Sequence, residues 1–324
     1  MAELRYNPLT KDWVMIASHR QNRPQMPKDW CPFCPGSGKV PDEGYTVLKY
    51  DNDFPALSQN PPVPDDVAND FFKTMPSYGK CEVILYSPEH TVTMSELGTD
   101  HIRKIVDLWQ ERFLEIKKDE NIKYVFIFEN RGDVVGVTMP HPHGQIYGYS
   151  FIPKKLELEI DSAKEHLKKT GKCLFCDMID NERAFSKRVI LENDDFITFL
   201  PFFSEYPYGV YIASKRHFDT LEDISESEKD SLADILKKTV GMLDNLFGYT
   251  FPYMMCLYQS PVNGEDTKES FHFHIAFYPP MRSSDKQKFN ASSETGAWAH
   301  CNPTAPEEKA EELRKAYKKF IENK

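Results

Sequence analysis

The sequence predicts an α+β protein made of two similar halves, in which helices pack on antiparallel sheet. Three observations lead to this prediction. A set of cysteine and histidine motifs occurs twice in the same order, strand-like segments of alternating polarity lie between the motifs, and each half has an amphipathic helical segment at an equivalent place. A chain of 324 residues also suits two domains of roughly 150 residues each. We therefore expect an N-terminal half, 1–160, and a C-terminal half, 161–324.

The repeat begins with a pair of cysteines two residues apart. The pair reads CPFC at 31–34 and CLFC at 173–176, and together the two pairs hold four of the seven cysteines. In an intracellular chain such pairs are more often metal ligands or redox centres than disulfides. Neither pair follows an obvious strand-to-helix pattern of the thioredoxin type, and the turn residues of CPFCPGSGKVP are typical of a zinc knuckle.

Histidines follow each cysteine pair in the same order. The strand-like segments EVILYSPEH and GVYIASKRH end at His90 and His217, and His141 and His272 come some fifty residues later. Two cysteines with two histidines suit tetrahedral zinc in its closed, structural form, which stabilises a fold and leaves no position for a substrate water. We predict two such sites: Cys31, Cys34, His90 and His141 in the first half, and Cys173, Cys176, His217 and His272 in the second.

Other segments support the duplication. VLKYDNDFPAL in the first half resembles VILENDDFITFL in the second, and amphipathic helices are expected over 98–118 and 224–248. A final helix is expected over 304–324, with Thr304 as its N-cap.

The stretch PHPHGQIYGY, 140–149, carries the candidate chemistry. His141, His143 and Gln145 alternate, so in an extended segment they point to one face. If His141 is a metal ligand, His143 is held beside it and is available as a nucleophile, since a neutral imidazole can attack phosphorus. Gln145 then offers an amide donor and Gly144 allows a phosphate to approach. The competing interpretations are an exposed polar edge, or His143 as a second ligand.

Composition excludes several function classes. The net charge of −10 disfavours a general nucleic-acid binder. No stretch has the ~18 apolar residues of a membrane span, and no secretory signal is visible, so we expect a cytoplasmic protein that contacts no membrane.

Taken together, these motifs resemble the galactose-1-phosphate uridylyltransferase family of the histidine-triad superfamily. The resemblance runs from RYNPLTKDWVMIASHRQNRP through CPFC, NDFPAL, CEVILYSPEH, FENRG and PHPHGQ to FYPP and KFNASSE. It implies two histidine-triad-like halves and transfer of UMP from UDP-glucose to galactose 1-phosphate. The implied route is ping-pong through a uridylylated His143, with Gln145 also catalytic.

The resemblance also assigns binding residues and a partner. It implies that Arg20 and Arg23 meet phosphates, that Asn52 and Asp53 hold the uridine, and that Asn130 and Thr138 lie beside the transferred phosphate. Lys288 and Glu294 match positions that reach the hexose from a partner subunit, so a homodimer is implied.

The metal of the second half is the main departure from the family pattern. Well-known members have an iron site formed by a glutamate and three histidines, and Glu159 matches that glutamate. Ala276 stands where the last of those histidines is expected, whereas Cys173 and Cys176 match a relative, ADP-glucose phosphorylase, which uses CxxC with two histidines. We therefore expect zinc at both sites, with iron and Glu159 as the alternative at the second.

Three other functions compete with the transferase. An ADP-glucose phosphorylase would use the same histidine with inorganic phosphate as acceptor, but that family resembles HPHSQ more than the HPHGQ found here. Hydrolases of the superfamily usually have a third histidine where Gln145 stands, and an amide cannot protonate a leaving group. A zinc-knuckle interaction protein without activity gives no reason for His143 and Gln145 to occur together.

Overall fold

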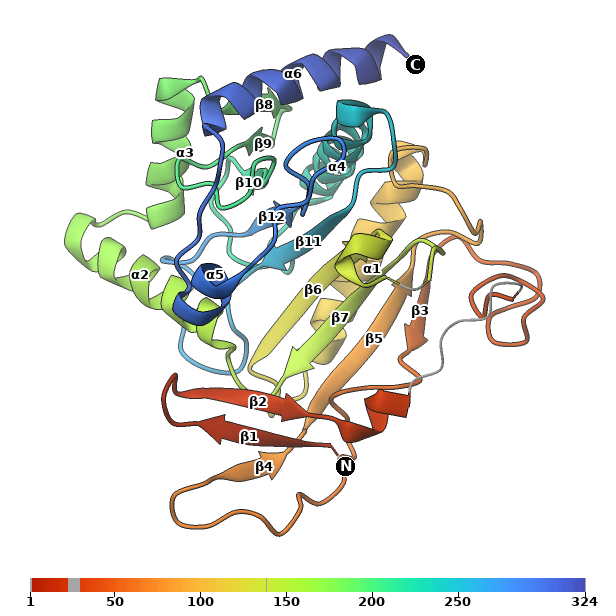
Figure 1. Cartoon of the computed structure of the whole chain (residues 1–324), viewed down its shortest axis with the longest axis vertical. Helices are drawn as coiled ribbons and strands as arrows, with labels where there is room; N and C mark the ends of the chain where they lie inside the picture. The colour runs from red at the N-terminus through yellow and green to blue at the C-terminus, as the bar shows by residue number, and fades with distance from the viewer. Residues whose placement is uncertain (1, 23–29, 138, 324) are drawn as a thin grey trace.

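The centre of the protein is one large antiparallel sheet, seen in a computed structural model that describes residues 2–22, 30–137 and 139–323 (Figure 1). The strands are β1 (Glu3–Asn7), β2 (Asp12–Ile16), β3 (Leu48–Asp51), β4 (Thr74–Pro76), β5 (Gly79–Leu85), β6 (Tyr124–Arg131), β7 (His143–Tyr149), β8 (Val189–Glu192), β9 (Phe196–Phe199), β10 (Tyr211–Ser214), β11 (Tyr253–Tyr258) and β12 (His274–Tyr278). The helices are α1 (Thr99–Ile116), α2 (Lys154–Thr170), α3 (Leu174–Phe185), α4 (Glu226–Phe247), α5 (Ser292–Ala297) and α6 (Pro306–Glu322), with short 3-10 turns η1 (Ser18–Asn22) and η2 (Asp133–Val135).

Nine of these strands form the large sheet, in the order β3-β5-β7-β6-β11-β12-β10-β9-β8. Every neighbouring pair in it is antiparallel. The remaining three strands form a small sheet, β2-β1-β4, at the lower end of Figure 1. The predicted α+β class with antiparallel sheet is therefore confirmed.

The strand order repeats about the centre of the sheet. The sequence of strands β5-β7-β6 on one side is matched by β10-β12-β11 on the other, and the halves join where β6 pairs with β11. Each histidine-x-histidine motif thus lies at the start of the middle strand of its trio, β7 or β12. The predicted division at 160/161 falls inside α2, the helix that connects the strands of the first half to those of the second.

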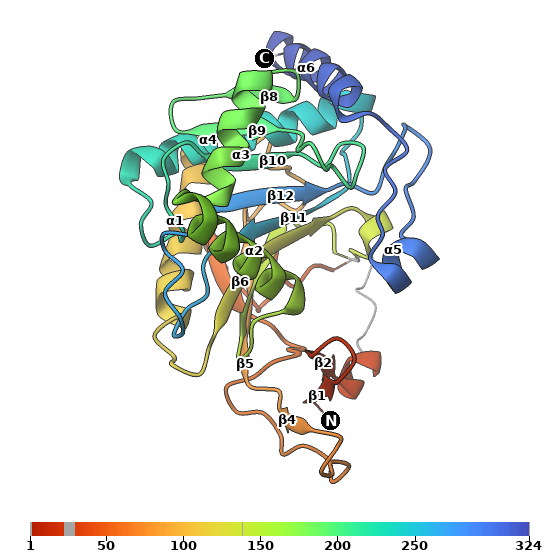
Figure 2. The same cartoon turned by 90° about the vertical axis from the view of Figure 1, so that its left-hand side faces the viewer.

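One face of the sheet is covered by α1 and α4 and holds the main apolar core (Figures 1 and 2). Both helices occur where amphipathic periodicity predicts them, and α1 buries Trp109 and Phe113 completely. Ser225 and Glu228 form a capping box that fixes the start of α4. α6 packs on α4 at Gly241, where a side chain would come within 2.3 Å of the Phe320 ring.

The opposite face has a second, aromatic core. Alternation along β6 and β7 places Tyr124, Tyr147 and Tyr149 on this face, where they pack with residues of α2 such as Leu156 and Ile160. This is the face that carries the functional residues. No helix in the described part of the chain is long and apolar enough to cross a membrane.

The last helix corrects one expectation. α6 begins at Pro306 with Ala305 as the residue before it, so Thr304 is not its N-cap. Thr304 Oγ1 donates instead to Asn302 Oδ1 at 2.8 Å. A proline at the first helical turn has no N–H to satisfy, which makes a side-chain cap unnecessary there.

Candidate active site and metal centres

The candidate nucleophile lies at the first residue of β7, on the aromatic face of the sheet. His143 and Gln145 both point to this face because they are two residues apart in a strand. They line a cavity of about 310 Å³, which we call the first-half cavity. Its other described lining residues include Arg20, Phe33, Tyr50, Asn52, Asp53, Phe54, Val83, Phe128, Asn130, Met139 and Tyr147.

The ring of His143 is held in one orientation and one tautomer. Its Nδ1 lies 2.8 Å from the backbone carbonyl oxygen of His141 and therefore donates to it. The lone pair of the neutral ring is then on Nε2, which is the atom that can attack an electrophile. Phe33, from the first cysteine pair, packs with its ring centroid 6.0 Å from that of His143.

Gln145 and Asn130 supply amides beside the histidine. Tyr147 Oη donates to Gln145 Oε1 at 3.4 Å, which leaves the Gln145 amide nitrogen as a donor toward the cavity. Asn130 lies near the end of β6, and its neighbour Phe128 is directly opposite Gln145 in the sheet. Two polar amides therefore flank His143 on adjacent strands.

The predicted uridine residues form the other side of the same cavity. Tyr50 Oη donates to both carboxylate oxygens of Asp53 at 3.0 Å, and Asn52 Oδ1 accepts from the backbone N–H of Phe54 at 2.9 Å. Arg20, in η1, lines the cavity as well. Sequence reasoning did not include Phe33 or Tyr50, although Phe33 stands between the two cysteines of the repeat.

Four predicted residues are not among the described residues that line this cavity. Arg23 and Thr138 lie outside the described residues. Lys288 and Glu294 line neither this cavity nor the metal centres. Lys288 is buried, and its Nζ lies 3.6 Å from Glu294 Oε1 and 5.1 Å from the ring centroid of Tyr206.

A buried polar cluster lies behind His143, on the helix-covered face of the sheet. A Cβ on Gly144 would lie 2.2 Å from Tyr86 Oη and 3.2 Å from the carbonyl oxygen of Phe128, so no side chain fits there as the strands stand. Glu129 is fully buried, and burial raises the pKa of its carboxyl to about 7. Tyr253 Oη donates to Glu129 Oε1 at 3.0 Å.

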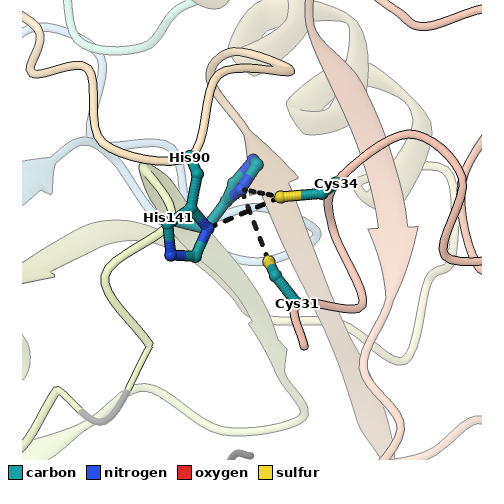
Figure 3. Close-up of side chains that lie close together, drawn as sticks. All are labelled: Cys31, Cys34, His90 and His141. Atoms are coloured by element: carbon teal, nitrogen blue, oxygen red, sulfur yellow. Dashed lines mark hydrogen bonds between the residues drawn. The ribbon is translucent and has the colours of Figure 1, made fainter. Parts of the chain in front are cut away.

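The first predicted metal set comes together beside this cavity (Figure 3). Cys34 Sγ lies 3.5 Å from His90 Nδ1 and 3.7 Å from His141 Nδ1, and Cys31 Sγ lies 3.6 Å from His141 Nδ1. Zinc bonds of ~2.3 Å to sulfur and ~2.0 Å to nitrogen at tetrahedral angles put sulfur and nitrogen about 3.5 Å apart. The donor set and its spacing therefore fit a tetrahedral metal.

The surroundings of this centre orient His141 so that its Nδ1 faces the two cysteines. Its Nε2 donates to the backbone carbonyl oxygen of Ser87 at 2.8 Å, which leaves Nδ1 to face the sulfurs. Burial lowers the pKa of His141 to about 4, so its ring stays neutral, the form that binds metal. Burial and the neighbouring Cys31 thiol raise the pKa of Cys34 to about 11 when no cation is present. A bound cation would offset that cost.

The second predicted set also comes together, at the equivalent place in the other half. Cys176 Sγ lies 3.5 Å from His217 Nδ1 and 3.4 Å from His272 Nδ1, and Cys173 Sγ lies 4.0 Å from His272 Nδ1. His272 Nε2 meets the backbone carbonyl oxygen of Ser214 at 2.9 Å, as His141 meets that of Ser87. Unlike the first pair, this one does lie at a helix start, because α3 begins at Leu174.

Glu159 is in neither group of metal-binding residues found in the described ranges. Its Oε1 lies 3.7 Å from Lys155 Nζ, one turn earlier on α2. The second Cys/His group has four ligand atoms without it. These two clusters could each hold a metal ion, and neither requires the glutamate.

Comparison with known proteins gives consistent results over nearly the whole chain. Residues 1–153 match the family model "Galactose-1-phosphate uridyl transferase, N-terminal domain", and residues 159–319 match the corresponding C-terminal domain. The chain is 41% identical to a galactose-1-phosphate uridylyltransferase of Thermotoga maritima, over 97% of this chain and 98% of the relative. It is similar to a solved uridylyltransferase structure with a TM-score of 0.90 and 32% identity, over 98% of this chain and 99% of that one. It shares its fold more distantly with an ADP-glucose phosphorylase of Arabidopsis thaliana, at a TM-score of 0.74 and 24% identity, over 97% and 98% of the two chains.

Proposed function

Because the chain belongs to the galactose-1-phosphate uridylyltransferase family, we propose that His143 is the group that carries UMP between two sugar phosphates. The protein is a transferase, and its substrates are a UDP-sugar and a hexose 1-phosphate, for which we propose UDP-glucose and galactose 1-phosphate. The observation that carries the proposal is the bond from His143 Nδ1 to His141 O, which puts the lone pair on Nε2.

The reaction then proceeds in two balanced steps. The Nε2 lone pair attacks the α-phosphorus of UDP-glucose, a phosphorus–nitrogen bond forms, and the bond from that phosphorus to the bridging oxygen breaks, which releases glucose 1-phosphate. In the second step a phosphate oxygen of galactose 1-phosphate attacks the same phosphorus, and the phosphorus–nitrogen bond breaks to give UDP-galactose and free His143. A covalent intermediate divides one difficult transfer into two easier ones.

Residues around His143 supply the charge stabilisation. The amide nitrogen of Gln145 donates to a non-bridging oxygen of the transferred phosphate, where negative charge grows in the transition state. Arg20 and Asn130, which line the same cavity, orient the phosphates. Arg23 and Thr138 have the same proposed role. The bond from His143 Nδ1 to a carbonyl oxygen stabilises the positive charge that the ring gains on attack.

The opposite wall suits the uridine. Asp53, held by Tyr50, and Asn52 offer polar atoms for a ribose and base, and Phe33 and Val83 offer apolar contact. The cavity of about 310 Å³ falls at the lower end of the usual range for small-molecule sites. Completion of the hexose site by Lys288 and Glu294 of a second subunit is consistent with this size, and on that basis we propose a homodimer in the cytoplasm.

Zinc is the metal we propose for both centres. Each has two thiols and two imidazoles, the set that zinc favours, and four protein ligands leave no open position. Zinc bound there would stabilise the fold and supply no step of the reaction. The first centre anchors the segment before β7 through His141, so it also positions His143 two residues later.

Steady-state kinetics test the proposal. Parallel reciprocal plots for UDP-glucose and galactose 1-phosphate, and exchange of labelled glucose 1-phosphate into UDP-glucose without the second sugar, are expected. Intersecting plots with no exchange would overturn the covalent route. The same exchange run with ADP-glucose, and discharge by inorganic phosphate, are expected to be at least tenfold slower. A faster reaction with ADP-glucose and inorganic phosphate than with UDP-glucose and galactose 1-phosphate would identify a phosphorylase.

A further inference from the structure

The second half has a cavity of its own at the place equivalent to the first-half cavity. This second-half cavity has a volume of about 500 Å³, within the range of small-molecule sites. It lies on the aromatic face of the sheet, between α2, α3 and the strands that carry His274 and Tyr211. The described residues that line it also include Leu158, Ala163, Leu174, Phe175, Met178, Phe203 and Phe271.

Two features at its base repeat those around His143. His274 follows His272 as His143 follows His141, and Nδ1 of each second histidine donates to the carbonyl oxygen of the first, at 2.9 and 2.8 Å. Phe175 stands between the two cysteines of the second pair as Phe33 does in the first. The duplication has therefore kept the frame of the pocket in both halves.

The chemistry of the pocket has not been kept. Ala276 stands where Gln145 stands in the first half, so the amide donor is missing. His274 is 6% exposed and is stacked between the rings of Phe175 and Tyr258, with centroids 4.2 and 4.8 Å away. A histidine enclosed in this way cannot attack a phosphate, so the second-half cavity can bind but not transfer.

The described walls of the cavity are mostly apolar, but they include one carboxylate with a buried, unpaired oxygen. Glu159 lines this cavity, and its Oε2 is buried and has no hydrogen-bond partner among the described residues. Its other oxygen faces Lys155. A buried carboxylate oxygen without a donor is costly, and a ligand that brings N–H groups would satisfy it. Aromatic walls with one acceptor suit a flat heterocycle that carries such donors.

We propose that the second-half cavity binds an unphosphorylated nucleobase or nucleoside with neighbouring N–H donors, of which guanine is the best match. The N1–H and exocyclic N–H of guanine lie side by side and can both donate to the Glu159 carboxylate, while the ring contacts Phe175 and Tyr211. Among the described residues that line the cavity, the one Lys or Arg is Lys155, which is already engaged with Glu159 and with the hydroxyls of Tyr258 and Tyr278, so these residues offer a phosphate no free positive charge. The proposal depends on the proposed function only in taking the first-half cavity as the place where a nucleotide binds.

Calorimetric titration of the zinc-loaded protein with guanosine tests this site. Measurable binding below millimolar concentration is expected, at least tenfold tighter than for inosine, which lacks the exocyclic amine and so loses a bond to a charged acceptor. Glu159→Gln should weaken guanosine binding about tenfold or more. Glu157→Gln should not change it, because Glu157 is a half-exposed neighbour on the same helix whose partner is Lys154.

Two further variants separate this site from the fold and from the first-half cavity. Ser162 is exposed at the cavity wall, so Ser162→Trp fills the space without disturbing the core and should abolish guanosine binding. His143→Gly should bind guanosine as the wild type does, whatever happens to UMP transfer. No guanosine binding, equal binding of inosine, or binding lost in His143→Gly would overturn the proposal. Loss of a metal equivalent from Glu159→Gln would overturn it too, by making Glu159 a metal ligand.

Discussion

Replacing Gly144 with alanine should lower both the stability and the activity of the protein, because the added methyl group would clash with Tyr86. The added Cβ would lie 2.2 Å from Tyr86 Oη, 2.9 Å from Tyr86 Cζ and 3.2 Å from the Phe128 carbonyl oxygen. Tyr86 is fully buried against Trp109, and Phe128 is held in the sheet, so neither can move aside freely. Overpacking of this kind costs about 1–3 kcal/mol.

The strain falls next to His143, so activity should fall further than stability. A displacement of β7 on the order of 1 Å would misplace the nucleophile and reduce transfer about 10²-fold. The melting temperature should fall by roughly 1.5–4.5 °C, because 1–3 kcal/mol is spread over the large unfolding entropy of a chain of 324 residues. A serine at this position adds a hydroxyl to the same Cβ and should be at least as damaging.

Two variants make the test specific. Gly264→Ala is the matched control, because Gly264 is not in the left-handed region and the added Cβ would meet only the Val262 carbonyl oxygen at an ordinary 3.7 Å, so it should lower stability by less than about 0.5 kcal/mol. Tyr86→Phe combined with Gly144→Ala removes the shortest contact and should recover part of the lost activity. Wild-type melting temperature and transfer rate in Gly144→Ala alone would refute the reasoning.

The remaining predictions concern the amide donor Gln145, the proposed zinc ligand His141 and the buried carboxyl group of Glu129. Gln145→Ala should slow transfer about 10²-fold and keep the wild-type melting curve, as measured by initial rates and calorimetry. Metal analysis should find two zinc per chain in the wild type and in His143→Gly, whose transfer added imidazole should partly restore, but about one in His141→Ala. Glu129 has a folded pKa of about 7 against an ordinary 4.5, so it binds more protons folded than unfolded, and stability should fall as pH rises from about 4.5 to 7. Denaturant titrations of Glu129→Gln across that window should lack this part of the slope.

Much of the fold and site followed from the spacing of a few residue types. Cysteines and histidines repeated in order are enough to predict two halves and two Cys/His clusters, because a metal needs four donors in one place. Alternation in PHPHGQ is enough to put His143 and Gln145 on one face. Local pattern could not predict the nine-stranded continuity of the sheet, since the pairing of β6 with β11 joins segments far apart in the chain.

Other features depended on contacts that a single sequence does not display. The need for glycine at 144 comes from Tyr86, which directly follows the neighbouring strand β5. The two cysteine pairs have similar sequences but different structures. CPFC at 31–34 forms turns, whereas CLFC at 173–176 lies at the start of α3, which begins at Leu174. Threonine is a residue type that often caps helices, but Pro306 already fixes the start of α6, so Thr304 is not the cap.

The central claim is that His143 carries UMP, and locating the adduct tests it most directly. The protein should be incubated with UDP-glucose alone, digested with trypsin at neutral pH and fragmented in a mass spectrometer. One tryptic peptide, 132–154, contains both His141 and His143, so fragment ions that separate Pro142 from His143 assign the modification. We predict one UMP on His143, lost when galactose 1-phosphate is added. UMP on His141, on another peptide, or on no residue would contradict the account.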